Sequence, residues 1–216
     1  MTVQEIRRDA VIRILKDAEF PVIVEAGACH GEDSQMLTYA CRHLENVVHI
    51  LIEPDPDNCH VIRQTALGVK GRRLIQGAVA GVSGIHKFNR AVERKTGYRF
   101  CGSLLEPQKD VFNQMVFDDV IDVRGYTLDD IFKHQKLTHI DLLWADVQGG
   151  ERGMLEGGWK ALSKTRYMYM EVVKEEQYVG ETLKEELISL LEQRGWSVEI
   201  DFESIGDVLM RNERYR

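Results

Sequence analysis

The sequence predicts an α/β protein with a mostly parallel sheet, helices on both faces and a C-terminal antiparallel hairpin. Three short apolar runs, at residues 22–24, 47–52 and 140–145, are typical of strands buried on both faces. Segments with helical periodicity lie between such runs. This alternation indicates βαβ units, whose right-handed connections place helices on either side of a parallel sheet.

The N-terminal residues 1–20 are expected to form a helix, because their apolar side chains recur at helical spacing. The strands of the main alternation are predicted at residues 22–24, 47–52, 73–79, 140–145 and 167–173. Helices are predicted at residues 32–44, 57–67, 127–134, 152–162 and 181–194. Two further strands, which form the hairpin with a tight turn at Gly206, are predicted at residues 196–202 and 207–211.

The middle of the chain has the least regular pattern. Residues 84–90 predict a short extra strand, and residues 91–126 are expected to be an irregular insertion that contains one more strand at 120–123. The first part of the insertion, residues 91–107, is either a lid on the acceptor side of a site or an ordinary surface loop. Because no repeat or linker is present, residues 1–216 are expected to form a single domain.

The charge pattern argues against a nucleic-acid partner. The chain has 28 basic and 35 acidic residues, a formal charge of −7, and lacks the clustered basic residues that phosphate binding needs. No apolar run approaches the ~20 residues that span a bilayer. Arg7, Arg8 and Asp9 interrupt any apolar core of a signal peptide.

The cysteines and histidines point to no metal site. Cys29, Cys41, Cys59 and Cys101 form neither a C-x-x-C pair nor a zinc-ligand pattern, and the histidines show no metal-ligand spacing. Free thiols are typical of a reducing compartment. The sequence therefore predicts a cytoplasmic protein without zinc.

A glycine turn follows the first predicted strand. Gly27 and Gly31 lie between that strand and the next helix, which is where a doubly wound sheet binds its ligand. Glycine lets the backbone approach a ligand closely and adopt positive φ. Glu25, just before the turn, is placed to meet a ligand ammonium group.

Glu53 ends the second predicted strand, 22 residues after Gly31. A carboxylate at this position can accept hydrogen bonds from both hydroxyls of a ribose. The alternative is that Glu53 only stabilises the start of the following helix. Together with the glycine turn, the carboxylate favours a bound nucleoside.

The residues around the turn favour S-adenosylmethionine over a dinucleotide. Cys29 and Glu32 stand where a dehydrogenase fingerprint has glycines. Glu32 and Asp33, at the helix start, would repel a pyrophosphate. An NAD(P)-dependent oxidoreductase and a non-catalytic nucleoside-binding module remain as alternative functions.

At this point the sequence resembles the FkbM family of methyltransferases over about residues 20–200. The matching blocks lie at residues 25–28, 53–54, 77–80, 102–104, 126–130 and 140–151, with Glu171 closing the next strand. The most specific block, IDLLWADVQGGE, is similar to the family's IDLLKIDVEGAE. Trp144 replaces the usual lysine, Gln148 replaces the usual glutamate, and Cys29 and His30 replace smaller or more polar residues.

The resemblance implies a Rossmann-like class I methyltransferase fold with a seven-stranded sheet, and S-adenosyl-L-methionine as the cofactor. It also implies O-methylation of a hydroxyl on a sugar, glycan or secondary metabolite. The residues expected to bind the cofactor are Glu25, Gly27, Ala28, Gly31, Glu53, Pro54, Ala78, Val79 and Asp146.

Asp146 and Glu171 are the predicted catalytic residues. Methyl transfer is an in-line displacement in which positioning does most of the work, and a general base helps when the acceptor is an alcohol. Asp146 is the candidate base, or alternatively binds the donor's amino group or caps the next helix. Glu171 either faces the acceptor or binds a loop amide. Because they end adjacent strands, the two carboxylates could also share a divalent metal, but no metal site is predicted from only two ligands.

Overall fold

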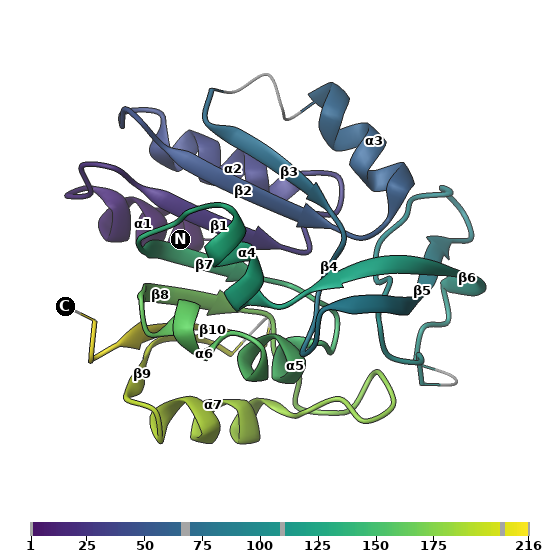
Figure 1. Cartoon of the computed structure of the whole chain (residues 1–216). Helices are drawn as coiled ribbons and strands as arrows, with labels where there is room; N and C mark the ends of the chain where they lie inside the picture. The colour runs from purple at the N-terminus through teal and green to yellow at the C-terminus, as the bar shows by residue number, and fades with distance from the viewer. Residues whose placement is uncertain (1, 66–69, 109–110, 204–205, 216) are drawn as a thin grey trace.

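A computed structural model describes residues 2–65, 70–108, 111–203 and 206–215. Its main sheet has seven strands in the order β3-β2-β1-β7-β8-β10-β9 (Figure 1). The strands are β1 Val22–Ala26, β2 Val48–Glu53, β3 Arg72–Gln76, β7 Ile140–Ala145, β8 Thr165–Met170, β9 Trp196–Phe202 and β10 Asp207–Asn212. The first five run parallel, and β10 and β9 add the predicted antiparallel hairpin. The predicted seven-stranded sheet is confirmed.

Helices cover both faces of this sheet, as Figure 1 shows. One face packs against α1 Val3–Leu15, α2 Glu32–Cys41 and α3 Pro56–Thr65. The other packs against α4 Leu128–His134, α5 Glu151–Glu156, α6 Trp159–Leu162 and α7 Lys184–Glu192. Every residue of β1 and β7 is buried, which explains why these strands have continuous apolar sequences.

The predicted strand at residues 73–79 is divided between two sheets. β3 ends at Gln76, and β4, Ala78–Val79, pairs with a different strand in a three-stranded sheet. Gly77 lies at the crossing, where a Cβ atom would come within 2.6 Å of the carbonyl oxygen of Arg124. The chain can pass that close only without a side chain.

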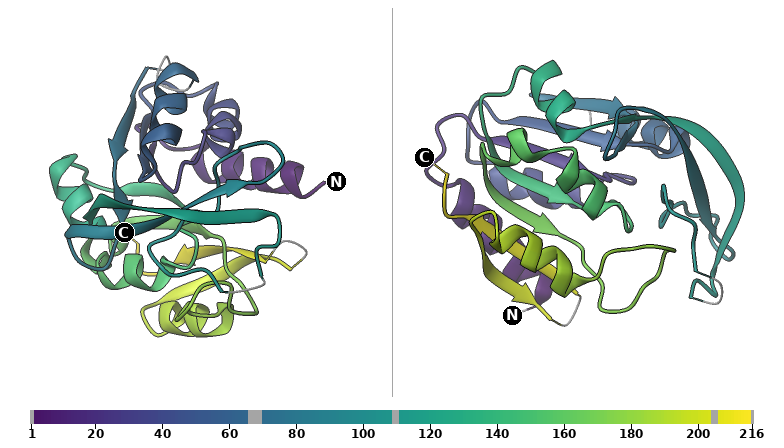
Figure 2. Two further views of the ribbon diagram at one scale, coloured as in Figure 1. Left: turned by 90° about the vertical axis from the view of Figure 1, so that its right-hand side faces the viewer. Right: turned by 60° about the horizontal axis from the view of Figure 1, so that its bottom comes forward.

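The prediction that residues 91–126 are irregular is wrong in part. β5, Gly84–Glu93, and β6, Met115–Tyr126, form a long antiparallel pair that extends beyond the main sheet (Figure 2). Charged residues interrupt the apolar ones along both strands, so the longer apolar runs that mark the main sheet are missing. The expected strands 84–90 and 120–123 are the cores of longer ones.

The helix boundaries differ from the prediction at several places. α1 ends at Leu15 and α2 ends at Cys41, where the predicted helices continue to residues 20 and 44. The helix predicted at 152–162 is divided into α5 and α6 at Gly157 and Gly158. The last helix, α7, begins at Lys184, three residues later than predicted. The helix predicted at 57–67 is α3, which ends at Thr65, and the last two predicted residues lie outside the described ranges.

The chain segments that follow β1 and β7 approach each other closely at the carboxyl ends of these strands. The amide of Asp146 donates to the carbonyl of Ala26 at 2.9 Å, so the two strands stay paired to their ends. Gly27 then turns away with φ +84°, and a Cβ atom there would lie 1.7 Å from the carbonyl oxygen of Asp146. Gly180 has a similar φ of +80° but nothing within 4 Å of its Cβ position.

We predict that Gly180→Ala lowers the free energy of unfolding by roughly 1–2 kcal/mol, the cost of left-handed backbone for a residue with Cβ. Gly27→Ala has the same cost and should lose a further ~1–3 kcal/mol or more, because the backbone of β7 must move. Urea unfolding of both variants checks this. Equal losses would show that the β1–β7 approach is not a constraint.

Glu151 holds the connection between β7 and α5. It is 4% exposed, and its Oε1 accepts a hydrogen bond from the amide of Val147 at 3.1 Å. Burial is the dominant effect and raises the pKa of Glu151 to about 8, with the nearby charge of Asp146 adding to the rise. The folded state therefore binds this proton more tightly than the unfolded chain does.

We predict a pH dependence of stability that Glu151→Gln removes. Between about pH 4.5 and 8 the unfolded carboxyl group loses its proton while the folded one keeps it. Wild-type stability should therefore fall relative to the variant as pH rises, by up to ~1.4 kcal/mol per pH unit, and level off above pH 8. Urea unfolding at several pH values measures the difference, and parallel profiles for the two proteins would refute the prediction.

Among the residues that the structure describes, no helix has both the length and the apolar character that crossing a bilayer requires.

Candidate functional site

A cavity of about 340 Å³ opens at the carboxyl ends of β1, β2, β7 and β8. Its volume falls within the range of small-molecule sites. Seven of the predicted site residues line it, namely Gly27, Glu53, Pro54, Ala78, Val79, Asp146 and Glu171. The structure therefore brings together residues from five separate segments of the chain.

Ala28 and Gly31, also predicted to bind the cofactor, do not line this cavity. Ala28 is buried against Leu51 and Ile62, beneath the turn. Gly31 has φ +87° and forms the N-cap of α2. Both residues shape the turn from behind, and Cys29, between them, contributes to the cavity wall.

The structure corrects the contact predicted for Glu25. Its carboxylate is 1% exposed and accepts hydrogen bonds from Ser34 Oγ at 2.7 and 2.9 Å. His49 Nε2 lies 2.7 Å from the same carboxylate. Side chains alternate along a strand, so Glu25 shares with Ile23 the face that packs on α1 and α2, away from the cavity.

Glu53 lies at the tip of β2 and is 4% exposed. Its Oε2 accepts the amide of Cys29 at 2.9 Å, and its Oε1 accepts the amide of Asp55 at 2.8 Å and Asn58 Nδ2 at 3.3 Å. Burial raises the pKa of Glu53 to about 8, although the backbone donors lower it in part. The glutamate thus fixes the glycine turn to the end of β2.

Asn58 is a cavity residue that sequence reasoning missed. It lies in the first turn of α3, and its buried Oδ1 has no hydrogen-bond partner among the described residues. A buried carbonyl without a donor is costly, so this atom calls for a ligand donor or a water molecule. The available signal in the sequence was its position five residues after Glu53, because the first turn of the helix that follows the strand folds back toward the end of that strand.

Asp146 and Glu171 meet through Gln148. Gln148 Nε2 lies 2.5 Å from Asp146 Oδ1 and 2.7 Å from Glu171 Oε2, and the hydroxyl of Tyr178 lies 2.9 Å from Gln148 Oε1. The charge of Asp146, and then burial, raise the pKa of Glu171 well above its ordinary value. The predicted pair is therefore a real cluster, and Gln148 belongs to it.

Trp144, the other departure from the family pattern, lies on the opposite face of the sheet. It stacks on Tyr169 with the ring centroids 3.8 Å apart, and its Nε1 donates to Asp33 Oδ2 at 3.1 Å. The guanidinium of Arg7 lies 4.7 Å from the Trp144 ring and also pairs with Asp33 at 3.2 Å. The tryptophan thus joins α1 and α2 to the sheet and does not reach the cavity.

The loop that follows β5 covers the cavity. Arg99, Phe100 and Leu104 line it, as do Cys101 and Gly102. The loop is joined to the glycine turn, because Tyr98 packs against His30 with ring centroids 4.1 Å apart. This position fits the lid alternative better than a plain surface insertion.

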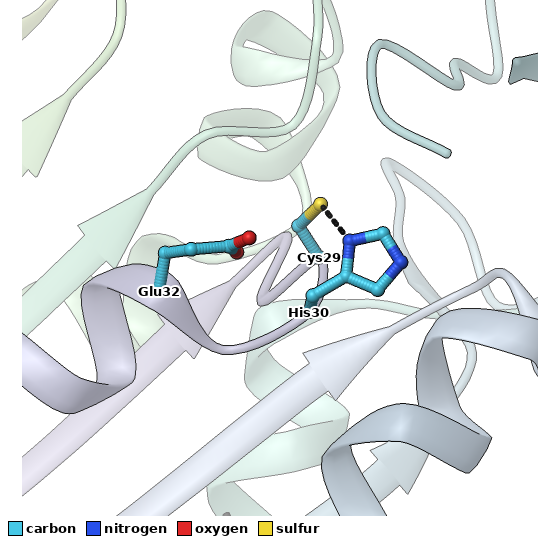
Figure 3. Close-up of side chains that lie close together, drawn as sticks. All are labelled: Cys29, His30 and Glu32. Carbon is cyan, nitrogen blue, oxygen red and sulfur yellow. Dashed lines mark hydrogen bonds between the residues drawn. The ribbon is translucent and has the colours of Figure 1, made fainter. Parts of the chain in front are cut away.

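Cys29, His30 and Glu32 come closer together than their sequence spacing led us to expect. One possible ligand atom from each lies within 4.8 Å of the others, with Cys29 Sγ 3.4 Å from His30 Nδ1 (Figure 3). Burial is the main cause that raises the pKa of the Cys29 thiol far above its ordinary value. The thiol is therefore protonated at neutral pH and is a poor metal ligand in this state.

Comparisons with known proteins agree with this geometry. The profile of the family described as "Methyltransferase FkbM domain" matches residues 25–198. The 2-O-methyltransferase NoeI of Sinorhizobium fredii is 29% identical over 199 residues, which cover 90% of this chain and 80% of that protein.

Solved structures share the fold. Methyltransferase FkbM from Methylobacillus flagellatus superposes with a TM-score of 0.54 at 13% identity, over 89% of this chain. This chain covers only 44% of that protein. The methyltransferase PaMTH1 of Podospora anserina, solved with S-adenosylhomocysteine bound, gives a TM-score of 0.52 at 11% identity, over 98% of this chain and 79% of its own.

The predicted Rossmann-like fold of class I methyltransferases is thereby confirmed. The family profile spans most of the chain, including the glycine turn, Glu53 and the Asp146 block. This protein belongs to the FkbM family of methyltransferases.

Proposed function

We propose that this protein transfers a methyl group from S-adenosylmethionine to a hydroxyl of a sugar, glycan or secondary metabolite. The observation that carries the proposal is a pair of buried acceptors, Glu53 at the tip of β2 and Asn58 in the first turn of α3, whose Oδ1 has no partner among the described residues. Both line the cavity beside the glycine turn.

The acceptor capacity of this pair suits the two hydroxyls of a ribose. A carboxylate offers about four lone-pair sites, and protein donors already use three of those on Glu53. The remaining site on Glu53 and the free Oδ1 of Asn58 can each accept one hydroxyl. Ile52, Ala78 and Val79 supply an apolar wall of the kind that an adenine ring needs.

The charge of the cavity supports a phosphate-free, cationic donor. Glu53, Asp146 and Glu171 are all part of its lining, and Arg99 is the cation among the lining residues. Arg99 itself pairs with Asp57, at 3.1 Å. Among these lining residues no unpaired cation is available to a pyrophosphate, which disfavours the dinucleotide alternative. S-adenosylmethionine carries no phosphate and supplies a methyl group already activated by the positive charge on sulfur.

The protein's own part is to position the acceptor and to remove its proton. Asp146 and Glu171 lie at the ends of adjacent strands, and the raised pKa of Glu171 makes it a stronger base than an ordinary carboxylate. Phe88, Phe100 and Leu104 give the lid side an apolar surface that can exclude water. The printed function of NoeI, 2-O-methylation, supports a hydroxyl acceptor.

The cysteines support a reducing compartment. None of Cys29, Cys41, Cys59 and Cys101 forms a disulfide, and Cys41 and Cys59 are buried. We therefore place the proposed reaction in the cytoplasm.

The proposal predicts that S-adenosylhomocysteine binds to the wild-type protein and that Glu53→Ala weakens binding by ~1–3 kcal/mol, because buried hydroxyls lose their acceptor. Glu185→Ala, at an exposed position of α7, is the matched control and should bind like the wild type. Isothermal titration calorimetry measures all three. Binding of NAD(P) in place of S-adenosylhomocysteine would refute the proposal.

Asp146→Asn and Glu171→Gln test the base. We expect each to lower kcat for methyl transfer to neutral mono- and oligosaccharides by ~10²–10⁴-fold, while the affinity of Glu171→Gln for S-adenosylhomocysteine stays near the wild-type value. Transfer of a radiolabelled methyl group gives kcat. Full activity in both variants would remove these carboxylates from the reaction.

A further inference from the structure

Gln148 contacts both carboxylates of the site, which also interact directly with each other. Its Nε2 carries two hydrogens and lies within hydrogen-bond distance of both Asp146 Oδ1, at 2.5 Å, and Glu171 Oε2, at 2.7 Å. One amide group therefore bridges groups that end two different strands.

The other end of the amide is held as well. The Tyr178 hydroxyl lies 2.9 Å from Gln148 Oε1 and 2.8 Å from the carbonyl oxygen of Cys101, and its single proton can serve either. Because both amide hydrogens point to carboxylates, Oε1 needs this hydroxyl as its donor. Tyr178 is 1% exposed, so it keeps the amide in one orientation.

The backbone of Gln148 is also fixed. It has φ +50°, a left-handed conformation that is uncommon outside glycine, and its carbonyl accepts a hydrogen bond from Ser103 Oγ at 2.6 Å. Non-glycine residues hold such a conformation only where the surroundings impose it. Backbone and side chain together therefore place the amide with little freedom.

A metal ion that bridged the two carboxylates would need the same space. Hard divalent cations lie ~2.0–2.6 Å from carboxylate oxygens, and Nε2, at 2.5 and 2.7 Å from the two oxygens, lies too close to them to leave room for such an ion. An amide N–H group offers no lone pair and repels a cation. The glutamate usual at this position in the family would instead add a third oxygen ligand.

We infer that Gln148 is a positioning residue that stands in for a bridging metal ion and holds Asp146 and Glu171 as a metal-independent base. The inference rests on the proposed function, since it names how the carboxylates of that site act. In the reaction, the new oxygen–carbon bond forms as the carbon–sulfur bond breaks, sulfur keeps the electron pair, and the hydroxyl proton passes to the carboxylate pair.

The surroundings favour a shared proton on this pair. Glu171 faces Asp146 from β7, Glu151 from α5 and Asp207 from β10, and all three raise its pKa. The amide hydrogens of Gln148 stabilise ionised oxygens on both partners, as a cation would, but without adding charge. The pair can then hold one proton and still accept hydrogen bonds.

The test measures Mn²⁺ binding by electron paramagnetic resonance on the wild type, Gln148→Ala and Gln148→Glu. Gln193→Glu, at an exposed position of α7's C-terminus, controls for the added charge. Gln148→Ala removes the amide and opens space for an ion beside the two carboxylates. Gln148→Glu removes the amide N–H groups and adds a carboxylate that can bind the ion. We expect Mn²⁺ affinity to rise from wild type to Gln148→Ala to Gln148→Glu, by about tenfold or more overall. The control should match the wild type.

Two results would overturn the inference: tight Mn²⁺ binding by the wild type, or no gain in Gln148→Glu over the control. The first needs no variant and decides the matter even if the substitutions unfold the protein. Titration of the same wild-type sample with S-adenosylhomocysteine separates the two proposals. Absent binding there refutes the methyltransferase function, whereas the order of Mn²⁺ affinities tests Gln148 alone.

Discussion

The structure depends on keeping several carboxylates buried at one edge of a sheet. Burial raises the pKa of Glu53 and of Glu151, whereas the charge of Asp146, and then burial, raises the pKa of Glu171. Isolated buried charges are unstable, so each must find donors. Backbone amides of the strand-end turns supply them for Glu53 and Glu151, and Gln148 supplies one for Glu171. The same carboxylates therefore order the turns and give the site its acidic character.

The two faces of the main sheet have different roles, since none of the described side chains on the face that packs on α1 and α2 lines the cavity. Behind β1 and β7, Arg7, Asp33 and Trp144 form a stacked, ion-paired layer that joins α1 and α2 to the sheet. That layer uses Trp144 where the family usually has lysine, and it lies away from the cavity. The replacement therefore changes the support of the sheet and leaves the cavity lining to other residues. This weakens the argument for a non-catalytic module, which began from that same replacement.

Sequence reasoning succeeded where burial leaves a simple pattern. The fully buried strands β1, β2 and β7 were predicted within a residue or two, since both of their faces demand apolar side chains. For β5 and β6 it found only the cores of the strands, at 84–90 and 120–123, and missed their full lengths because charged residues interrupt the apolar ones. Within the site, it found Glu53 from its place at a strand end but assigned Glu25 to the wrong face, because strand alternation was not applied to that residue. Asn58, which lines the cavity, comes from a helix, and Tyr178, which contacts Gln148, comes from a loop 30 residues further along the chain that only the fold brings close.

The replacement at position 148 has a consequence for how this site handles charge. With glutamate there, three carboxylates would meet at the ends of β7 and β8, and mutual repulsion would favour either extra protons or a cation. Glutamine removes one negative charge and adds two donors, so the remaining pair is stabilised by hydrogen bonds alone. In the reaction proposed above, a cationic methyl donor would then meet a site whose negative charge no metal neutralises. On that proposal, the same amide that replaces a metal leaves the attraction for the sulfonium intact.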